Sequence, residues 1–496
     1  MALDNYTTIH FNIMVRIAKA FLSGNFAREV ERIPVRMRSR YKRTTRCCVY
    51  RDRAIIKYRA MAILGFNIED EIEMDDELIA LSEYAEKAVE REKIHEPMIT
   101  FLDEACVGCI QTHYETTNVC RGCMNQACAS VCPKNAVTVI NRKSHIDHRK
   151  CIQCGKCMKA CPYNAIVKVP IPCEESCPTG AISKDLTGKQ VIDYEKCIFC
   201  GKCIEACPFN AVLEKSQLVD VLKKLTGGKK LVAMIAPAII GEFPGINGDL
   251  GKLVTALKMV GFKDVVEVAH GADRTATLEA EEFIERMEEG SDFMTSSCCP
   301  AYTELVMKHV PELYPFVSDT PTPMHFTAER VKDEDPDAIT VFIGPCVAKR
   351  HEGVANPLVD HVLTFQEIEA LFIAEDIAAC ECESETLTDL PSHTGRGFPI
   401  SGGVTTAVKT QIAEKCDVNP VEVDGLDKRS IKTLRNFALG SCPGNFVEVM
   451  GCHGGCVAGP ATIANTRKAT NIVKKFVQKS AQGEDMTQPP CDQHDA

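Results

Sequence analysis

Apolar and polar positions follow different patterns in different parts of the chain. In residues 1–100 the apolar runs are short, and Arg16 and Lys19 interrupt the first of them, so we expect helices there. From about Leu218 onward, apolar segments of strand length alternate with amphipathic ones: KKLVAMIAPAI, DVVEVA, a helical pattern from Thr275 to Met287, and AITVFIGPC. Strands that alternate with helices are typical of an α/β domain with a largely parallel sheet.

The segment between these two parts is dominated by cysteine. Sixteen cysteines lie between Cys106 and Cys207, and eight of them form two runs with the spacing C-x2-C-x2-C-x3-C-P. The run from Cys120 to Cys132 repeats this spacing with a four-residue gap after Cys123, which we interpret as a tolerated insertion. Pattern and composition together divide the chain into four expected parts. These are a helical region at 1–100, cluster-binding modules at 101–215, an α/β domain at 218–475 and a disordered tail at 476–496.

The cysteines are expected to bind metal. A disulfide framework is the usual reason for many cysteines in a short secreted domain, but this chain has 496 residues and shows no charged-then-apolar leader pattern. Its longest apolar run, Leu231 to Gly241, falls short of the roughly 18 residues that a membrane-spanning helix needs. We therefore expect no membrane span and a cytoplasmic, reducing location, where clustered C-x2-C spacing indicates metal ligands.

The charge of the chain argues against a nucleic-acid partner, because the net charge is -11. Residues 28–59 are a basic exception, and an acidic stretch at 69–77 follows them. We expect two helical faces that complement each other or a partner protein. The closely spaced basic residues are Arg36, Arg38, Arg40, Lys42, Arg43 and Arg46. Cys47 and Cys48 lie in the same segment and are interpreted as ordinary thiols.

Residues 120–161 have the pattern of a ferredoxin with two 4Fe-4S clusters. In such modules the fourth cysteine of each run binds the other cluster, because the loop surrounds three corners of the cube and the next segment leads away. The expected ligand sets are Cys120, Cys123, Cys128 and Cys161 for one cluster, and Cys151, Cys154, Cys157 and Cys132 for the other.

A second module begins at Cys173. The same rule predicts a third cluster, whose ligands are Cys177, Cys197, Cys200 and Cys203. Cys173 and Cys207 are left over, and the pair Cys106 and Cys109 would complete a fourth set. This fourth set rests on counting, so spare thiols or a zinc site remain alternatives to it. For the whole region zinc is disfavoured, because three thiolates so close in one loop suit a cubane better than a zinc ribbon.

Three further cysteine-containing segments lie in the α/β region. They are MTSSCCPAY with Cys298 and Cys299, IGPCVAKRHE with Cys346, and EVMGCHGGCVAGP with Cys452 and Cys456. From roughly residue 230 to residue 466, these segments resemble the three motifs of the [FeFe], or iron-only, hydrogenases in sequence and order. Cysteines from three distant segments can meet only in a buried site.

The resemblance implies a fold and a cofactor. The expected fold is α+β ferredoxin-like modules followed by an α/β hydrogenase domain, with a helical segment at the N-terminus. The family carries an H-cluster, a 4Fe-4S cube joined through a thiolate to a two-iron unit with CO, cyanide and a bridging dithiolate. By resemblance Cys299, Cys346, Cys452 and Cys456 would hold the cube, with Cys456 shared between the two parts. Cys298 would be the thiol that delivers protons, a role suited to a thiol whose pKa is tuned by its surroundings.

Other roles also follow from the resemblance. Lys349 would donate to a cyanide ligand, and Met450 and the pair Ala236-Pro237 would form walls of the pocket. The residues that match the family's route for protons to the surface are Glu279, Glu282, Ser318 and Arg286. For the two glutamates, a solvated helix face is the simpler interpretation.

The chain departs from the family pattern in the pocket. Gly344 stands where a Met usually precedes the Pro-Cys pair, Tyr302 stands in place of a Trp, and Ser297 is an addition that we interpret as tolerated. The third motif ends in VAGPA instead of glycines and Gln. These changes resemble a divergent clostridial-type, group B-like subgroup. His453 is either a donor near the cluster or a solvent-facing side chain.

We expect an enzyme that interconverts protons, electrons and H2, with a ferredoxin as electron donor or acceptor and maturation proteins that supply the two-iron unit. The basic N-terminal segment is a candidate docking surface for that ferredoxin. Two alternatives remain. One is a hydrogen sensor of low turnover, although sensors of the family usually carry a signalling domain for which the C-terminal residues leave no space. The other is an iron-sulfur scaffold without the two-iron unit, which Cys298 and Lys349 argue against.

Overall fold

The computed structural model describes most of the chain. The described residues are 5–40, 48–71, 79–106, 109, 112–186, 188–243, 245–246, 248–386, 389–413 and 415–483. Lys42, Arg43, Arg46 and Cys47 of the basic segment, most of the acidic stretch, and residues 484–496 of the expected tail lie outside them.

The N-terminal region is helical. Its elements are α1 (Asn5–Leu22), α2 (Phe26–Glu31), α3 (Ile33–Met37), α4 (Val49–Ile63), the 3-10 helix η1 (Ile68–Asp70) and α5 (Leu81–Glu90). Ile13, Met14 and Ile17 form a buried apolar stripe on α1. This stripe shares one hydrophobic core with Ile368 and Leu371 of α16 (Phe365–Ala374), so the N-terminal helices are packed directly onto the C-terminal domain.

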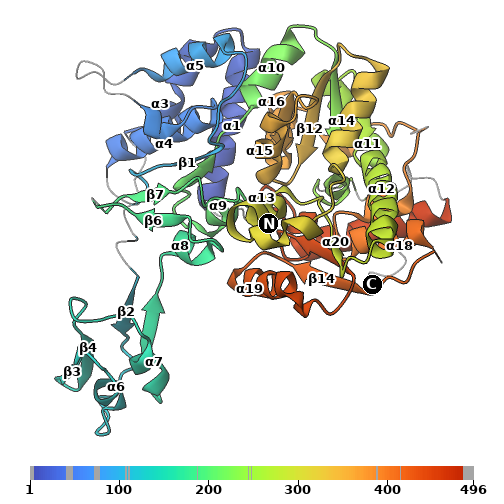
Figure 1. Cartoon of the computed structure of the whole chain (residues 1–496). Helices are drawn as coiled ribbons and strands as arrows, with labels where there is room; N and C mark the ends of the chain where they lie inside the picture. The colour runs from blue at the N-terminus through green and yellow to red at the C-terminus, as the bar shows by residue number, and fades with distance from the viewer. Residues whose placement is uncertain are drawn as a thin grey trace, which may run out of the picture.

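Two similar modules follow. The first has the antiparallel pairs β2 (His113–Thr116) with β5 (Ile166–Val169) and β3 (Val137–Ile140) with β4 (Lys143–Ile146), and the short helices α6 (Ala127–Ser130) and α7 (Lys156–Ala160). The second has β6 (Ile182–Lys184) paired with β7 (Gln190–Ile192), and helices α8 (Pro172–Ser176) and α9 (Lys202–Ala206). β1 (Ile99–Phe101) pairs antiparallel with β8 (Val212–Glu214) and joins the two ends of the whole region. The first module projects away from the body of the molecule, whereas the second lies against it (Figure 1).

The C-terminal domain is built on two parallel sheets. One has the order β10-β9-β12-β13, with strands at Asp264–Glu267, Leu231–Ile235, Ile339–Gly344 and His361–Thr364. The other has the order β11-β15-β14, with strands at Met294–Thr295, Phe446–Met450 and Pro420–Asp424. The predicted α/β domain with a largely parallel sheet is therefore confirmed, and so are the strands at 231–235, 264–267 and 339–344.

Helices cover both sheets (Figure 1). The α-helices of this domain are α10 (Leu218–Thr226), α11 (Leu250–Val260), α12 (Ala269–Glu288), α13 (Pro300–His309), α14 (Pro323–Glu334), α15 (Ala348–Ala355), α16, α17 (His393–Gly397), α18 (Gly403–Ile412), α19 (Lys428–Asn436) and α20 (Thr466–Gln482). The short 3-10 and π segments are η2 (Pro237–Gly241), η3 (Pro311–Phe316), η4 (Ala379–Glu381), η5 (Phe437–Ser441) and η6 (Cys456–Ala458). The described helices include none that is both long and apolar enough to cross a membrane.

The sequence predicts that the disordered tail begins at residue 476, and this start is too early. Helix α20 continues to Gln482, and Phe476 is buried within it. The guanidinium of Arg396 lies 4.9 Å from the centre of the Phe476 ring, a cation–π contact that fixes this end of the helix. The sequence pattern missed the helix because its apolar positions are widely spaced among lysines.

Candidate active site and cluster sites

The two parallel sheets end at one cavity. β9 leads into Ala236-Pro237, β12 into Pro345-Cys346, and β15 into Gly451-Cys452. In open parallel sheets ligands bind beyond the carboxyl ends of the strands, and here a cavity of about 110 Å³ lies at that place. Its cysteines are Cys298, Cys299, Cys346, Cys452 and Cys456, and its other lining residues include Ala236, Pro237, Phe342, Lys349, Phe398 and Met450.

Four of these thiols suit a metal cluster. Burial, together with repulsion from the other thiolates, raises the pKa of Cys346 and that of Cys456 to about 12. For Cys452 the same two causes raise the pKa well above the ordinary value of a thiol. Thiolates this close together need cationic metal to hold them in the charged form. The four residues that resemble H-cluster ligands therefore do line one space, and the apolar wall beside them would exclude water from the group.

Lys349 lies on this cavity near the N-terminus of α15. Its Nζ is 2.6 Å from Glu352 Oε2, and Thr322 donates a hydrogen bond to the same carboxylate. Burial by itself would lower the pKa of Lys349. The negative charge of Glu352 and its hydrogen bond with the ammonium have a larger effect, so the pKa of Lys349 is raised. Lys349 therefore presents a lasting positive charge to the cavity, which suits an anionic ligand such as cyanide.

Gly344 has a structural explanation. A Cβ at this position would lie 2.5 Å from Cε1 of Phe342, whose ring lines the cavity. The ring thus takes space next to the position where the family usually has Met. Tyr302, which stands in place of the family Trp, is fully buried and its hydroxyl lies 2.7 Å from that of Thr295. These departures change the cavity wall and leave the cysteines in place.

On the α12 side of the cavity, Cys298 adjoins a buried glutamate. Glu279 Oε1 accepts hydrogen bonds from the backbone N–H of Ser297 at 3.0 Å and from its hydroxyl at 3.3 Å. Glu279 is fully buried, and burial raises its pKa to about 8. Burial, with the charge of Glu279 as the next cause, raises the pKa of Cys298 well above that of an ordinary thiol. The solvated helix face considered for the two glutamates is wrong for Glu279.

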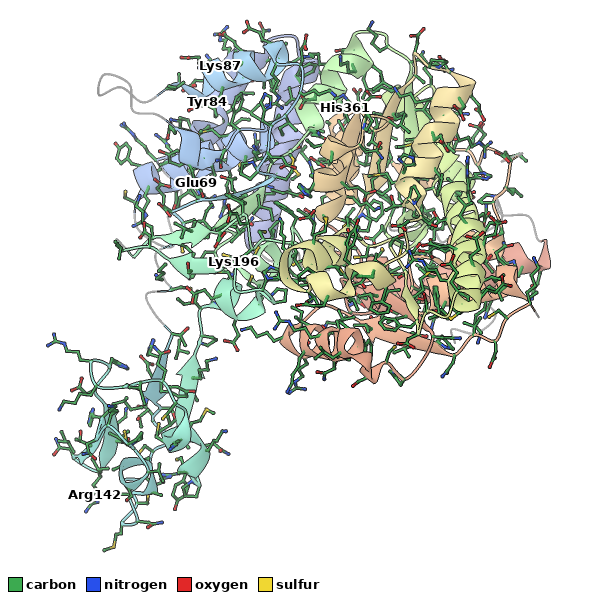
Figure 2. All side chains as sticks on the ribbon, viewed as in Figure 1. Glu69, Tyr84, Lys87, Arg142, Lys196 and His361 are labelled. Carbon is green, nitrogen blue, oxygen red and sulfur yellow. The ribbon has the colours of Figure 1, made fainter. Side chains whose placement is uncertain are left out.

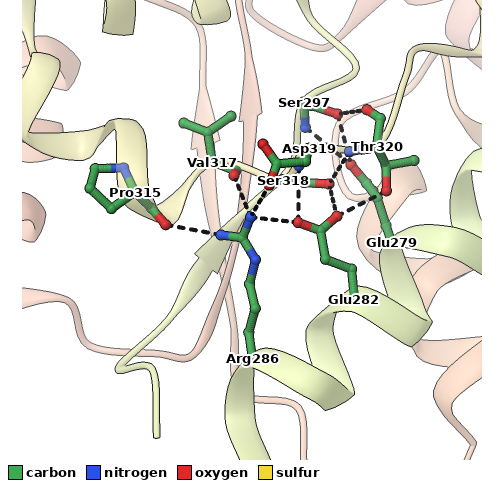
Figure 3. Close-up of polar contacts among 9 residues, drawn as sticks. All are labelled: Glu279, Glu282, Arg286, Ser297, Pro315, Val317, Ser318, Asp319 and Thr320. Atoms are coloured by element: carbon green, nitrogen blue, oxygen red, sulfur yellow. Dashed lines mark hydrogen bonds and ion pairs between the residues drawn. The ribbon is translucent and has the colours of Figure 1, made fainter. Parts of the chain in front are cut away.

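One turn further along α12, Glu282 lies beside Ser318, Thr320 and Arg286 (Figure 3). Its carboxylate accepts from the hydroxyl of Ser318 at 2.5 Å and from that of Thr320 at 2.9 Å. Arg286 Nη2 lies 2.6 Å from Glu282 and 3.1 Å from the exposed Asp319. The structure thus brings together all four residues of the expected proton route, ordered from the buried Glu279 to the surface.

The third accessory set surrounds a small cavity. Cys177, Cys197, Cys200 and Cys203 line a space of about 20 Å³. Burial raises the pKa of Cys200 to about 12, although the backbone N–H and the charge of Lys202 oppose this rise. Burial, followed by repulsion from the other thiolates, raises the pKa of Cys203 well above the ordinary value. The four thiols of this set therefore share one space.

The fourth set also comes together. Burial and then the charge of Cys207 raise the pKa of Cys106 to about 11, and burial with Cys207 and Cys106 raises that of Cys173 to about 12. Burial and then the charge of Cys207 also raise the pKa of Cys109. The structure thus places the four leftover cysteines within electrostatic reach of one another. No three His, Cys, Asp or Glu side chains in the described part of the chain form a single-ion site.

The first module is less fully defined. Cys132 and Cys151 both raise the pKa of Cys157 after burial, which supports their common set. In the other set, Cys120 accepts a hydrogen bond from the backbone of Ser144, whose hydroxyl lies 3.9 Å from the sulfur of Cys128. Cys123, Cys154 and Cys161 stay predicted ligands of these two sets.

The third set lies next to the main cavity. Cys200 contributes to the raised pKa of Cys452, after burial and the thiolates of the main cavity. A Cβ on Gly201 would be 2.7 Å from Cγ of Pro460 and 3.2 Å from Val347. The loop of the second module therefore packs directly on two of the loops that carry the central cysteines.

This fold and site define an iron-sulfur oxidoreductase domain with ferredoxin-like modules. Residues 229–460 match the family model of the iron only hydrogenase large subunit, C-terminal domain, and residues 145–167 and 191–213 match the 4Fe-4S binding domain. The chain is 31% identical to the periplasmic [Fe] hydrogenase large subunit of Nitratidesulfovibrio vulgaris, over 63% of this chain and 85% of that protein. It is 28% identical to iron hydrogenase 1 of Clostridium pasteurianum over 66% of each chain, and so spans about two thirds of that enzyme.

The chain belongs to the iron-only, or [FeFe], hydrogenase family. Among solved structures, the [FeFe]-hydrogenase HydA1 from Chlamydomonas reinhardtii is similar at 19% identity and a TM-score of 0.42, over 53% of this chain and 92% of that one. The predicted fold class of ferredoxin-like modules followed by a hydrogenase domain is confirmed. The cofactors are 4Fe-4S clusters in the modules and, in the catalytic domain, the H-cluster of this family.

Two residues of the site were missed from the sequence. Ser297, interpreted as a tolerated addition, is the hydrogen-bond partner of Glu279, and Thr320 joins Ser318 in binding Glu282. The position of Ser297 directly before the two cysteines was the available signal for it, whereas nothing in the sequence pointed to Thr320. His453 is exposed, which agrees with its solvent-facing interpretation.

Proposed function

We propose that this chain is a hydrogenase that catalyses 2 H+ + 2 e- = H2 in both directions, with electrons exchanged with a ferredoxin through its accessory clusters. The observation that carries the proposal is one cavity lined by Cys298, Cys299, Cys346, Cys452 and Cys456 together with Lys349. Two further observations support it: Ser297 and Thr320 bind Glu279 and Glu282 on one side of this cavity, and the loop of the second module packs on the loops of the central cysteines on another. In this proposal protons and electrons reach the same cavity by these two routes.

Each part of the chain has a distinct task in this proposal. The H-cluster, when bound, supplies the metal centre at which H2 forms or splits. Cys299, Cys346, Cys452 and Cys456 would hold the cluster, Lys349 would orient it through its charge, and Met450 and Phe342 would keep water away. Excluding water strengthens these electrostatic contacts.

Protons move along side chains. Cys298 holds a proton on its sulfur and exchanges it with Glu279, which carries a proton at neutral pH because burial raises its pKa to about 8. From there Ser318, Glu282 and Arg286 lead to the surface. A carboxyl group with a pKa near the working pH is suited to taking up and releasing protons.

Four accessory clusters are proposed, with the ligand sets given above. The fourth is supported by the mutual approach of Cys106, Cys109, Cys173 and Cys207. We also propose a reducing location such as the cytoplasm, since so many unpaired thiols require it. Maturation proteins would have to supply the two-iron unit.

The test is anaerobic expression, addition of the two-iron unit, and measurement of H2 evolution from a reduced dye together with iron content. We expect turnover with about 22 irons per chain, or about 18 if the fourth set holds no cluster. Full iron content without turnover would contradict the enzyme and favour a hydrogen sensor of low turnover. Iron of the cubes alone, with no uptake of the two-iron unit, would favour a scaffold.

A further inference from the structure

The two modules contain the same loop in two different surroundings. The first copy has the sequence Cys151-Ile-Gln-Cys-Gly-Lys-Cys157 and the second Cys197-Ile-Phe-Cys-Gly-Lys-Cys203. Their backbones agree as well, because φ is 57° at Gln153 and 54° at Phe199. Positive φ at a non-glycine residue is uncommon, so its repetition shows that the loops share one conformation.

The second copy docks on the catalytic domain. Ile198 is 2% exposed and Phe199 is 3% exposed. The Phe199 ring stacks on His351 with centroids 4.1 Å apart, and Lys202 donates to the carbonyl of Leu426. Gly201 in the same loop packs on Pro460 and Val347, which lie close to the central cysteines in the chain. In the second module, therefore, this loop is the surface that docks on the catalytic domain.

In the first copy the residues that correspond to this docking surface face solvent. Ile152, which corresponds to Ile198, is 56% exposed, and Cys154 and Lys156 are exposed too. The whole module projects from the body, with Arg142 at its far end (Figure 2). A large apolar side chain and a cluster cysteine are thus presented at the surface of a loop whose repeat is a docking surface.

Charge distinguishes this module from the rest of the chain. Residues 112–169 contain nine Lys and Arg against two Asp and Glu, an excess of seven positive charges in a chain whose net charge is -11. Eight of the nine are exposed, namely Arg121, Lys134, Arg142, Arg149, Lys150, Lys156, Lys159 and Lys168. Within the described residues only two of these eight have an acidic partner, Lys150 with Asp147 and Lys168 with Glu175.

We propose that the Cys154 face, formed by Arg149, Lys150, Ile152, Cys154 and Lys156, docks a small one-electron carrier protein whose surface is acidic around its redox centre. This inference rests on the proposed function and adds to it the place where the carrier binds. An apolar centre with a charged rim is the usual composition of a transient interface. The positive charge would steer an acidic carrier toward the cluster edge.

The electron balance is simple. The carrier loses one electron, the cluster bound by Cys151, Cys154, Cys157 and Cys132 gains one, and no bond forms or breaks. The reverse transfer serves H2 oxidation.

The N-terminal basic segment, which the sequence suggested as the docking surface, is less suited to this task. Arg36 is paired with Glu29, and Arg38 lies 3.4 Å from Asp52. The positive charges of these two arginines are therefore partly neutralised within the chain and attract an acidic partner less. The two surfaces can be compared directly by experiment.

The test uses the triple variant Arg149→Gln, Lys150→Gln, Lys156→Gln in the full chain. The measurement is the stopped-flow rate at which a reduced, acidic bacterial ferredoxin bleaches the visible absorption of the chain's own 4Fe-4S clusters. This readout does not need the two-iron unit, so it distinguishes failure of the docking surface from failure of hydrogenase activity. Iron content confirms that the variant has kept its clusters.

We expect the second-order rate at low salt to fall about tenfold, and the difference to vanish in about 1 M salt, where the Debye length is about 3 Å. A matched control is Lys468→Gln, Lys474→Gln, Lys475→Gln, which removes three exposed lysines from α20 and should leave the rate unchanged. The proposal is overturned if the Cys154-face variant reacts like the wild type, or if Arg36→Gln, Arg38→Gln, Arg40→Gln lowers the rate instead.

Discussion

Glu279 accepts two hydrogen bonds from Ser297, one from the backbone N–H and one from the hydroxyl. Ser297 precedes Cys298 directly, and its hydroxyl also lies 2.5 Å from the carbonyl oxygen of Thr320. The loop that carries the central thiols is thereby held against helix α12. The same contacts orient the carboxyl group of Glu279, whose other oxygen is buried and has no hydrogen-bond partner among the residues that the structure describes.

Replacing Glu279 should stop proton supply. We expect Glu279→Gln to lower H2 turnover about 10²-fold or more, because Gln is nearly isosteric and cannot exchange the proton. Glu279→Asp keeps the ionisable group and should retain more activity. Equal loss in both variants, with full iron content, would point to packing and not to proton transfer.

The same residue predicts a dependence of stability on pH. Burial raises the pKa of Glu279 from 4.5 to about 8. Between these values the folded protein holds a proton that the unfolded chain has lost, so stability falls as pH rises from about 4.5 to about 8. Thermal unfolding of Glu279→Gln across this range should show a smaller decline than the wild type. Parallel curves would contradict the buried, protonated carboxyl group.

Cys298 is expected to be required for turnover and dispensable for cluster binding. Cys298→Ala should lower H2 evolution by about 10² to 10⁴-fold, the usual contribution of general acid–base catalysis, while iron content stays the same. Cys416→Ala, which changes a cysteine outside the cavity, serves as control. Wild-type turnover in Cys298→Ala would exclude Cys298 from the proton route.

The fourth accessory cluster can be tested by metal analysis. Cys173→Ser should lower the iron content by about four per chain if Cys173 holds a 4Fe-4S cluster. Cys380→Ser, at a cysteine remote from all the sets, should not change it. A loss of one zinc instead of iron would identify a zinc site, and no loss of metal would leave Cys173 a spare thiol.

The contact between Gly201 and Pro460 should matter for electron entry. Gly201 has φ +76°, and a Cβ there would clash with Pro460 at 2.7 Å. Gly201→Ala should cost about 1 kcal/mol or more from backbone strain, and should also slow turnover driven by ferredoxin by displacing the loop. Gly188→Ala serves as the control, because it introduces the same backbone strain without a clash: φ is +84° and nothing lies within 4 Å of an added Cβ. Equal ferredoxin-driven rates in the two variants would contradict the relay.

A buried ion pair joins the cluster region to the catalytic domain. Arg350 is fully buried, pairs with Glu367, lies 3.3 Å from Glu214 and donates to the carbonyl of Lys215 at 2.9 Å. Arg350→Met would leave two buried carboxylates without a positive charge, so we expect a loss of about 3 to 5 kcal/mol in unfolding free energy. Removal of the exposed pair of Lys87 with Glu83 should cost at most about 0.5 kcal/mol. Similar losses in denaturant titrations would contradict this difference.

The sequence predicted β9, β10 and β12 because apolar residues follow one another in these segments, but it did not predict β13 at the edge of the same sheet. It failed at the tail, where α20 gains its stability from contacts such as that of Phe476 with Arg396. It also failed at Ser297, because a hydroxyl one residue before two cysteines has no meaning until α12 lies beside it.

The sequence by itself determined the chemistry of this protein. Thiol spacing within a loop is a local property. The spacing of Cys197, Cys200 and Cys203 therefore predicts a 4Fe-4S cluster independently of the rest of the fold. Tertiary structure decided what those thiols meet. Two loops of similar sequence and backbone differ in their surroundings, because Ile198 is buried against the catalytic domain and Ile152 faces solvent. Burial and charge also set the pKa of Glu279, which depends on residues far apart in the chain.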